Sequence, residues 1–321
     1  MISRVVFDVP HETDGKTVLR LPPKLFDHDF YAERTDRNIG WITKEEQEMI
    51  RHTTVGVAGC GGMGAQLAEK FLRLGVGEIR IADNEVFDVS NINRQFAAGR
   101  TTVGVSKALA TARMLRDISE DSTIVMYPQG ICEETVESFV SGCDVICDEV
   151  EFFAVGPRIL LHQAARRAGV GIFNCNTVGF GTRLFLFTPQ SVTIEEMFGL
   201  TLPEAMELSR ALRSKEATPE MGKKVIDCVL GALVPELPSY VKGKKDLKQV
   251  LCRLAKGQAS IIATNPPMAT GFVADRVLFY LLRNSSTVRT VKPTPLVPGY
   301  LYVDVARMKA RIVTGRKWWT R

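Results

Sequence analysis

The sequence lacks long apolar runs and any secretory signal. No stretch of its 321 residues approaches the run of about 18 apolar residues that a membrane-spanning helix needs. The first thirty residues carry charges and the turn-like TDG, and no basic start leads into an apolar run. We therefore expect a cytoplasmic protein with no membrane partner.

Cysteine is sparse and has no paired spacing. An odd number of thiols in a chain of ordinary size fits reduced cysteines better than a disulfide framework. No C-x-x-C pair occurs, so no zinc site is expected. The seven cysteines stand at positions 60, 132, 143, 147, 175, 228 and 252.

A Walker A sequence and a strong charge imbalance are also missing. Without G-x-x-x-x-G-K-[ST], a P-loop kinase or ATPase is disfavoured. The formal net charge is only +5, and the basic excess gathers in residues 241–257 and in the terminal GRKWWTR. Those lysines fit a solvated helix face or a docking surface for an acidic peptide or nucleic acid. Aromatic residues are not interleaved with them, which weakens an argument for single-strand binding.

What the sequence does contain is a regular alternation of strands and helices. Residues 54–59, 61–76 and 78–85 predict a strand, a helix and a second strand that ends in acids, which is a βαβ unit. The same alternation continues, with helices expected at 107–118, 133–140 and 156–169 and strands at 122–129, 144–150, 170–179 and 182–189. We therefore predict an α/β fold, doubly wound and Rossmann-like, around a mainly parallel sheet.

The alternation of strands and helices gives way to helical segments after residue 189. This change predicts a division into four segments. Residues 1–30 form an N-terminal arm, and residues 31–189 form the alternating core. Residues 190–264 predict a helical insertion that faces the substrate. Residues 265–321 predict a C-terminal helix and a hairpin that complete the same domain.

A glycine loop follows the first core strand in VAGCGGMGAQ. Gly59, Gly61, Gly62 and Gly64 stand between this strand and a helix, where backbone amides can approach phosphates without obstruction by a Cβ atom. Asp83 closes the next strand, where a carboxylate can accept hydrogen bonds from ribose hydroxyls. These features fit NAD and ATP equally well.

The segment after the second strand favours a triphosphate. Asn91, Arg94 and Gln95 are expected in the loop on the phosphate side, and Lys107 begins the next helix. A dehydrogenase has no use for an arginine and a lysine just beyond the acid that binds ribose. A guanidinium and an ammonium group neutralise a phosphate tail and stabilise the charge that develops as pyrophosphate leaves.

The segments GCGGMG, IADNEVFDVSNINRQF and GVSK together resemble the nucleotide signature of the ThiF/MoeB/HesA adenylyltransferases, the bacterial relatives of ubiquitin-activating enzymes. The resemblance covers about residues 31–189 well, and it makes this core an ATP-binding adenylation core. It implies ATP at the four glycines, ribose on Asp83, and phosphates facing Asn91, Gln95 and the catalytic Arg94 and Lys107. In this family a carboxylate attacks the α-phosphate, an acyl-adenylate forms and pyrophosphate departs.

The resemblance also implies a homodimer and a magnesium ion. An arginine near the N-terminus of family members reaches the partner's ATP, and Arg37 matches it best, with Arg34 as the alternative. The family binds Mg²⁺ through an aspartate in a D-x-x-D context. Here DEVEFF places Asp148 on the first acid and Glu151 on the metal-binding one, and glutamate can ligate Mg²⁺ with a longer reach. A solvated end of a strand is the alternative interpretation.

The cysteine of the sulfur-transferring members is absent after LFLFTP, and so are their paired zinc motifs. Cys228 and Cys252 remain as possible nucleophiles in the insertion, although free cysteines more often pack inertly. His162 has no partner pattern and fits a structural or surface position better than a catalytic base.

These residues predict an ATP-dependent enzyme that adenylylates a carboxylate on a peptide or small protein. Maturation of a ribosomally made peptide fits best, because the microcin- and pantocin-maturing relatives work in this way. A dehydratase-type tRNA modification and activation of a ubiquitin-like sulfur carrier are alternatives; nucleic acid is otherwise not an expected partner. A silent partner subunit and an NAD enzyme conflict with the intact Arg94 and Lys107.

Overall fold

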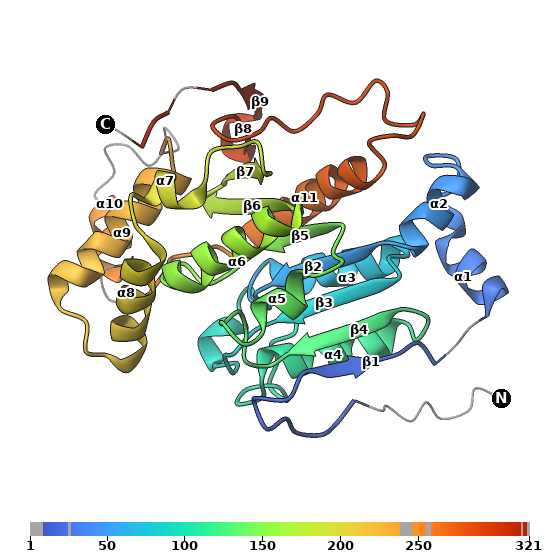
Figure 1. Cartoon of the computed structure of the whole chain (residues 1–321), viewed down its shortest axis with the longest axis horizontal. Helices are drawn as coiled ribbons and strands as arrows, with labels where there is room; N and C mark the ends of the chain where they lie inside the picture. The colour runs from blue at the N-terminus through green and yellow to red at the C-terminus, as the bar shows by residue number, and fades with distance from the viewer. Residues whose placement is uncertain (1–8, 25–26, 238–245, 255–257, 316, 320–321) are drawn as a thin grey trace. The chain divides into compact units, whose positions relative to one another are not determined.

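The structure is a computed structural model that describes residues 9–24, 27–237, 246–254, 258–315 and 317–319 (Figure 1). The chain divides into two compact units. The first comprises Met1–Glu149 and Thr270–Pro293, and the second comprises Val150–Ala269 and Thr294–Arg321. The four-segment division expected from the sequence stays a prediction.

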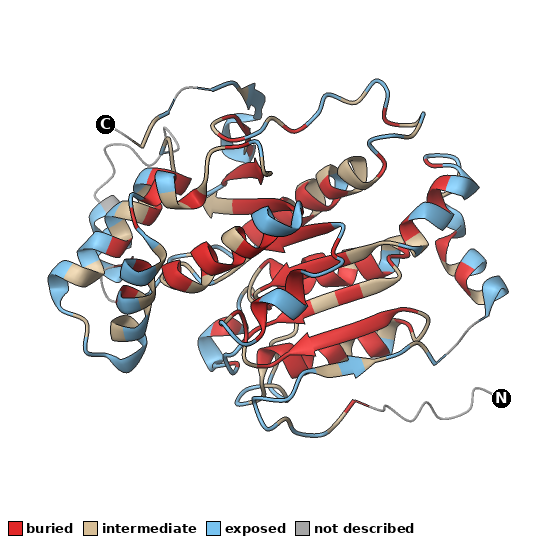
Figure 2. Cartoon of the chain, viewed as in Figure 1, coloured by how far each residue is buried: buried red, intermediate tan, exposed pale blue. Residues whose placement is uncertain are grey.

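The first unit is built on a sheet with a parallel centre. Parallel pairing joins β2 to both β3 and β5, and β3 to β4. A short strand, β1, pairs antiparallel with β4 at the edge. Nearly all side chains of the central strands are buried (Figure 2). The order across the sheet is β1 (Leu19–Leu21), β4 (Thr123–Tyr127), β3 (Glu78–Ala82), β2 (Thr54–Ala58) and β5 (Val145–Asp148).

Helices cover both faces of this sheet, as a doubly wound fold requires. In Figure 1, α3 (Gly64–Leu74) and α4 (Lys107–Ile118) lie behind the strands and α5 (Val136–Val140) lies in front. The unit also contains α1 (His28–Thr35), η1 (Asp36–Asn38), α2 (Lys44–Arg51), η2 (Val89–Asn91) and the greater part of α11 (Asn265–Leu281).

Local sequence explains where these helices begin and end. The hydroxyl of Ser106 caps α4 by accepting the N–H of Leu109 at 3.4 Å. Thr43 and Glu46 form a capping box that starts α2. Gly75 ends α3 in the left-handed region, with φ at +97°, a conformation that glycine adopts without a steric penalty.

The predicted N-terminal arm contains a strand that the sequence analysis did not foresee. Leu19 pairs with Met126 of β4, so β1 extends the sheet at its edge. Three residues cannot display an alternating pattern, and their partner is far along the chain. A strand of this kind therefore has no local signature.

The second unit contains a sheet with antiparallel neighbours throughout. Its strands follow the order β6 (Gly171–Val178), β7 (Gly181–Phe187), β8 (Tyr300–Asp304) and β9 (Lys309–Val313). A tight turn at Gly179, with φ at +60°, joins β6 to β7. The strands and the C-terminal hairpin expected from the sequence are all present. The predicted α/β fold class is confirmed, with the parallel part described here in the first unit.

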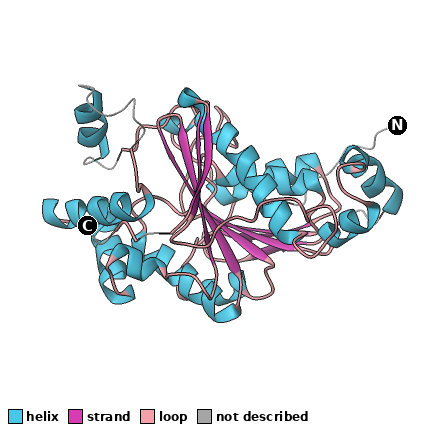
Figure 3. Cartoon of the chain, turned by 90° about the horizontal axis from the view of Figure 1, so that it is seen from above, coloured by secondary structure: helices cyan, strands magenta, loops and turns pink. Residues whose placement is uncertain are grey.

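The second unit also contains helices; Figure 3 draws the helices of the chain in cyan and its strands in magenta. Helix α6 packs closely on α8, and a Cβ atom at Gly156 would lie 2.8 Å from the Cα atom of Met206. The helices are α6 (Val155–Ala168), α7 (Ile194–Phe198), α8 (Leu202–Ser214), α9 (Pro219–Leu233) and α10 (Asp246–Leu254). Within the lysine-rich stretch, residues 241–245 and 255–257 lie outside the described residues. In the described part of the chain, no helix combines the length and apolarity needed to cross a bilayer.

Candidate nucleotide-binding site

The glycine loop leaves the carboxyl end of β2 and turns sharply into α3. Gly59 has φ at +107°, and its N–H donates to the carbonyl of Ala82 at 2.7 Å. A Cβ atom on Gly64 would lie 1.8 Å from the carbonyl oxygen of Gly59, so no larger residue fits there. Gly61 is roomier, since its nearest neighbour would be the Gln95 side chain at 3.9 Å. The loop therefore packs tightly on itself at Gly64 and has free space beside Gly61.

Asp83 fastens this loop to the end of β3. Its carboxylate accepts the N–H of Cys60 at 2.7 Å and the N–H of Glu85 at 2.8 Å. Burial of the carboxyl group raises the pKa of Asp83 to about 6, although the nearby Lys107 charge opposes the rise. In this structure Asp83 shapes the loop, and its contact with ribose stays a prediction.

Lys107 lies at the start of α4, beside the same strand end. Its backbone N–H donates to the carbonyl of Glu85 at 2.9 Å, and its Nζ atom donates to Glu85 Oε2 at 2.6 Å. Only 7% of the Lys107 side chain is exposed, and Nζ lies 5.9 Å from the ring centroid of Phe87. Lys107 begins a helix, as its sequence predicts, whereas its partner Glu85 carries no sequence signal of this contact.

A tight turn around η2 carries the other predicted polar residues. The carbonyl of Asn91 accepts the N–H groups of Arg94 at 3.1 Å and Gln95 at 2.8 Å. The Arg94 guanidinium donates to the carbonyl of Ser90 at 3.1 Å and to Asn93 Oδ1 at 2.9 Å. Arg94 is therefore held over the turn by local contacts.

Gln95 contributes an unsatisfied polar atom next to the glycine loop. The residue is 7% exposed, and its Oε1 atom has no hydrogen-bond partner among the described residues. A buried amide oxygen without a donor is costly. A Cβ atom at Gly61 would lie 3.9 Å from Gln95 Nε2, so Gln95 has its side-chain N–H donor, and not Oε1, nearest the loop.

Gln66, in the first turn of α3, also contacts the glycine loop. Its Nε2 atom donates to the carbonyl of Gly62 at 3.0 Å, and its Oε1 atom accepts the hydroxyl of Thr270 at 3.4 Å. Helix α11 thus supports the first turn of α3. A glutamine in the first turn of a helix after a glycine loop gives no distinctive sequence signal.

The two N-terminal arginines have different environments. Arg34 is engaged inside the first unit, where Nε donates to Asp121 Oδ2 at 2.6 Å and Nη1 donates to the carbonyl of Leu72 at 2.8 Å. The Arg37 side chain is 98% exposed and lies 3.8 Å from its neighbour Asp36. Of the two alternatives, Arg37 is the one that presents its guanidinium to solvent; its role stays a prediction.

The predicted metal ligands lie on either side of the boundary between the units. Asp148 ends β5 in the first unit and is 1% exposed. Glu151 belongs to the second unit, and its carboxylate accepts the N–H of Phe153 at 2.6 Å. Among the residues that the structure describes, no group of three or more His, Cys, Asp or Glu side chains could hold a metal ion. Magnesium binding by Asp148 and Glu151 stays a prediction.

Of the two thiols considered as nucleophiles, Cys228 is partly buried and Cys252 is exposed, and a nucleophilic role for Cys252 stays a prediction. Burial raises the pKa of Cys60, which lies inside the glycine loop, well above its usual value. Burial also raises the pKa of Cys228 in α9. A raised pKa lowers the fraction of reactive thiolate, so both cysteines fit packing roles.

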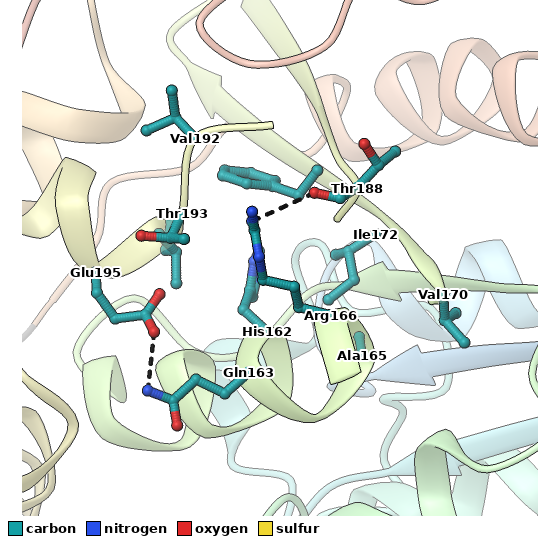
Figure 4. A pocket seen from close by; sticks show the side chains of 12 residues that line it. His162, Gln163, Ala165, Arg166, Val170, Ile172, Thr188, Val192, Thr193 and Glu195 are labelled. Carbon is teal, nitrogen blue, oxygen red and sulfur yellow. Dashed lines mark hydrogen bonds between the residues drawn. The ribbon is translucent and has the colours of Figure 1, made fainter. Parts of the chain in front are cut away.

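The second unit has a small hollow of its own, between α6, the β6 and β7 strands and the start of α7 (Figure 4). His162 packs edge-on against Phe187 at 4.7 Å between ring centroids. Gln163 Nε2 donates to Glu195 Oε1 at 2.8 Å, and Arg166 caps the carbonyl of Ser191 at 3.0 Å. A cavity of about 20 Å³ has room for about one water molecule. His162 is therefore a packed structural residue.

The glycine loop, the acid after β3 and the buried cation at the start of α4 meet at the carboxyl end of parallel strands. Ligands of doubly wound folds bind at this edge, so the first unit has the architecture of a nucleotide-binding domain. The ThiF family model matches residues 35–317, and the chain belongs to the ThiF family.

Two curated relatives illustrate the range of the family. The chain is 31% identical over 141 residues to the adenylyltransferase and sulfurtransferase MOCS3 of Mus musculus, which covers 44% of this chain and 30% of the relative. It is 28% identical over 238 residues to the tRNA threonylcarbamoyladenosine dehydratase of Escherichia coli K12, covering 71% of this chain and 85% of that protein. The chain spans less than half the length of several curated relatives it matches.

A solved structure with the same fold extends over both units. The crystal structure of E. coli MccB with ATP has a TM-score of 0.60 and 16% sequence identity. The similarity covers 92% of this chain and 75% of the MccB chain.

Proposed function

We propose that the protein is an ATP-dependent adenylyltransferase that activates a carboxylate on a peptide or small protein. The observation that carries this proposal is that the glycine loop, its anchor Asp83 and the buried Lys107 lie together at the carboxyl ends of the parallel strands. Membership of the ThiF family and the ATP-bound MccB neighbour support the choice of ATP.

In the proposed reaction, a carboxylate oxygen of the acceptor attacks the α-phosphorus of ATP. A new oxygen–phosphorus bond forms, the bond to the bridging α,β-oxygen breaks, and pyrophosphate leaves with that electron pair. Arg94 and Lys107 neutralise the charge that grows on the leaving group. Loop amides at the start of α3 hold the phosphates.

Magnesium would add positive charge at the phosphates when bound. Mg²⁺ is usually bound by one or two carboxylates together with substrate phosphates, without an all-protein cage. Asp148 and Glu151 supply suitable oxygen donors, and we propose them as its ligands. Asp148 lies at the carboxyl end of β5, and ligands of doubly wound folds bind at the carboxyl ends of the strands.

A peptide or small-protein acceptor agrees with the relatives. MccB has been crystallised with MccA, and MOCS3 is named as an adenylyltransferase and sulfurtransferase. The missing cysteine after β7 argues against a sulfur-transfer step in this chain. We therefore favour maturation of a ribosomally made peptide, performed by a homodimer in which the exposed Arg37 reaches the partner's ATP.

A tRNA acceptor is the second candidate. It is favoured by one observation: the match to the tRNA threonylcarbamoyladenosine dehydratase of E. coli spans 85% of that protein. Binding of tRNA through phosphate contacts would be strongly weakened by salt.

The test is ATP–pyrophosphate exchange, with peptides, small carrier proteins and tRNA added one at a time. Exchange that depends on one acceptor identifies the substrate class, and exchange with tRNA alone would replace the peptide proposal. A protein that binds no ATP in direct titration would overturn the whole proposal.

A further inference from the structure

Lys107 is a buried cation, and its ion-pair partner Glu85 is accessible to solvent. The lysine side chain is 7% exposed, whereas the glutamate side chain is 49% exposed. A buried ammonium group needs a counter-ion, and Glu85 supplies one through the 2.6 Å contact between Nζ and Oε2.

The charges that face this pair are predominantly negative. Asp83 interacts electrostatically with both Lys107 and Glu85. Asp88 interacts with Lys107 and also faces Arg94. Three carboxylates therefore stand against two cations. A triphosphate would gain little from Lys107 while the lysine remains paired with Glu85.

We propose that Glu85 is a positioning residue: its carboxylate is the counter-ion of Lys107 until nucleotide phosphates displace it from the lysine. This inference rests on the proposed binding of ATP at the glycine loop. It assigns a role to an acid that lies outside the glycine loop and outside the set of residues predicted to contact ATP.

The backbone around the pair allows this displacement without rearrangement of the fold. The Lys107 N–H bond to the Glu85 carbonyl measures 2.9 Å, and the Phe87 N–H bond to the Val105 carbonyl measures 3.0 Å. These bonds fix both segments, so only side chains need to move. The half-exposed Glu85 carboxylate can turn into solvent, while Lys107 stays beside the Phe87 ring.

The proposal predicts an effect that depends on the number of phosphates. Glu85→Gln keeps a hydrogen-bond acceptor for Lys107 but removes the competing charge. We expect ATP to bind about three- to tenfold more tightly to this variant, in the range of a partly exposed ion pair. ADP should gain less, and adenosine should bind as it does to the wild type.

Isothermal titration of the full chain with ATP, ADP and adenosine at fixed ionic strength tests this. Glu196→Gln is the matched control, because Glu196 is 45% exposed and pairs with Lys317 in the second unit. This control should leave all three affinities unchanged. Melting curves of each variant establish that it is folded.

The outcomes separate the inference from the proposed function. If the wild type binds ATP but Glu85→Gln binds it equally or more weakly, the proposed displacement of Glu85 is wrong. The proposed nucleotide site is then unaffected. An equal change in ATP and adenosine affinity would reveal a merely structural role and also overturn the displacement. If the wild type binds no adenine nucleotide, both the displacement and the proposed function fail.

Discussion

The two units bury positive charge in different ways. In the first unit, Lys107 contacts a glutamate that is 49% exposed. In the second, Arg183 on β7 is completely buried, donates to the carbonyl of Glu236, and lies over the Tyr302 ring at 4.9 Å from its centroid. The first cation has a partner that solvent can reach, and the second is enclosed.

The neighbours of Arg183 form an interlocked set. The Glu236 carboxylate accepts the hydroxyl of Tyr300 at 2.9 Å and pairs with Arg311. The Tyr302 hydroxyl donates to Asp304 at 2.9 Å, and burial raises the pKa of Tyr302 to about 12. These contacts link β7, β8 and β9 of the antiparallel sheet with Glu236, whereas the charged groups at the glycine loop lie beside the proposed nucleotide site.

The largest expected loss of stability comes from adding a Cβ atom to the glycine loop. Gly64→Ala places a Cβ atom 1.8 Å from the Gly59 oxygen, which the loop can relieve only by opening. We expect a loss of about 4 kcal/mol or more in the free energy of unfolding, measured by urea denaturation. Gly61→Ala is the control: its Cβ atom has space, so stability should stay near wild type while ATP binding falls. Equal stability of the two variants would contradict the loop geometry.

Arg183→Ala should lower stability without touching the nucleotide site. The substitution leaves a cavity and an unpaired carbonyl at Glu236, which together should cost about 3 kcal/mol. The melting temperature measures this loss, and titration with ATP under conditions where the variant is folded should give the wild-type affinity. A strong loss of ATP affinity in the folded variant would break the distinction between the two units.

Lys107→Ala should behave in the opposite way. Removing a cation that meets the leaving group should reduce ATP–pyrophosphate exchange by about a hundredfold. The melting temperature should change little, because the released Glu85 carboxylate is half exposed and can be hydrated. Retained exchange would show that another cation serves the phosphates.

The sequence predicted the regular part of the fold because each core element carries its own signal. Helix α4 has the predicted bounds, Lys107–Ile118, since Ser106 caps it and its apolar residues recur at helical spacing. Strand β1 escaped prediction because three residues have no period. Helix α2 was missed although Thr43 and Glu46 carry the capping-box pattern, which could have revealed it.

The sharp turn of the glycine loop follows from the sequence, whereas contacts between side chains of different segments do not. The spacing of Gly59 and Gly64 predicts the loop. Glu85 follows Asp83 by two positions, but nothing in the sequence says that it will contact a lysine on the next helix. The sequence favours Arg37 over Arg34, and only the structure shows that Asp121 engages Arg34.

The smallest predicted effect concerns the pH dependence of stability. The pKa of Asp83 is raised from 3.8 to about 6 in the folded protein, so the folded state holds a proton that the unfolded state releases between these values. Asp83 therefore destabilises the fold above pH 6, and this penalty disappears as the pH falls toward 4. Its contribution should favour folding by about 2 kcal/mol more at pH 4 than at pH 7.

Asp83→Asn isolates this contribution from those of other acids. Glu46, whose pKa is lowered to about 2, acts in the opposite direction and contributes equally to both proteins. Urea denaturation at pH 4, 5, 6 and 7 should therefore give a difference between wild type and variant that changes by about 2 kcal/mol across the range. A difference independent of pH would mean that Asp83 has the same pKa in the folded and unfolded states, because its bonds to Cys60 and Glu85 would then offset the cost of burial.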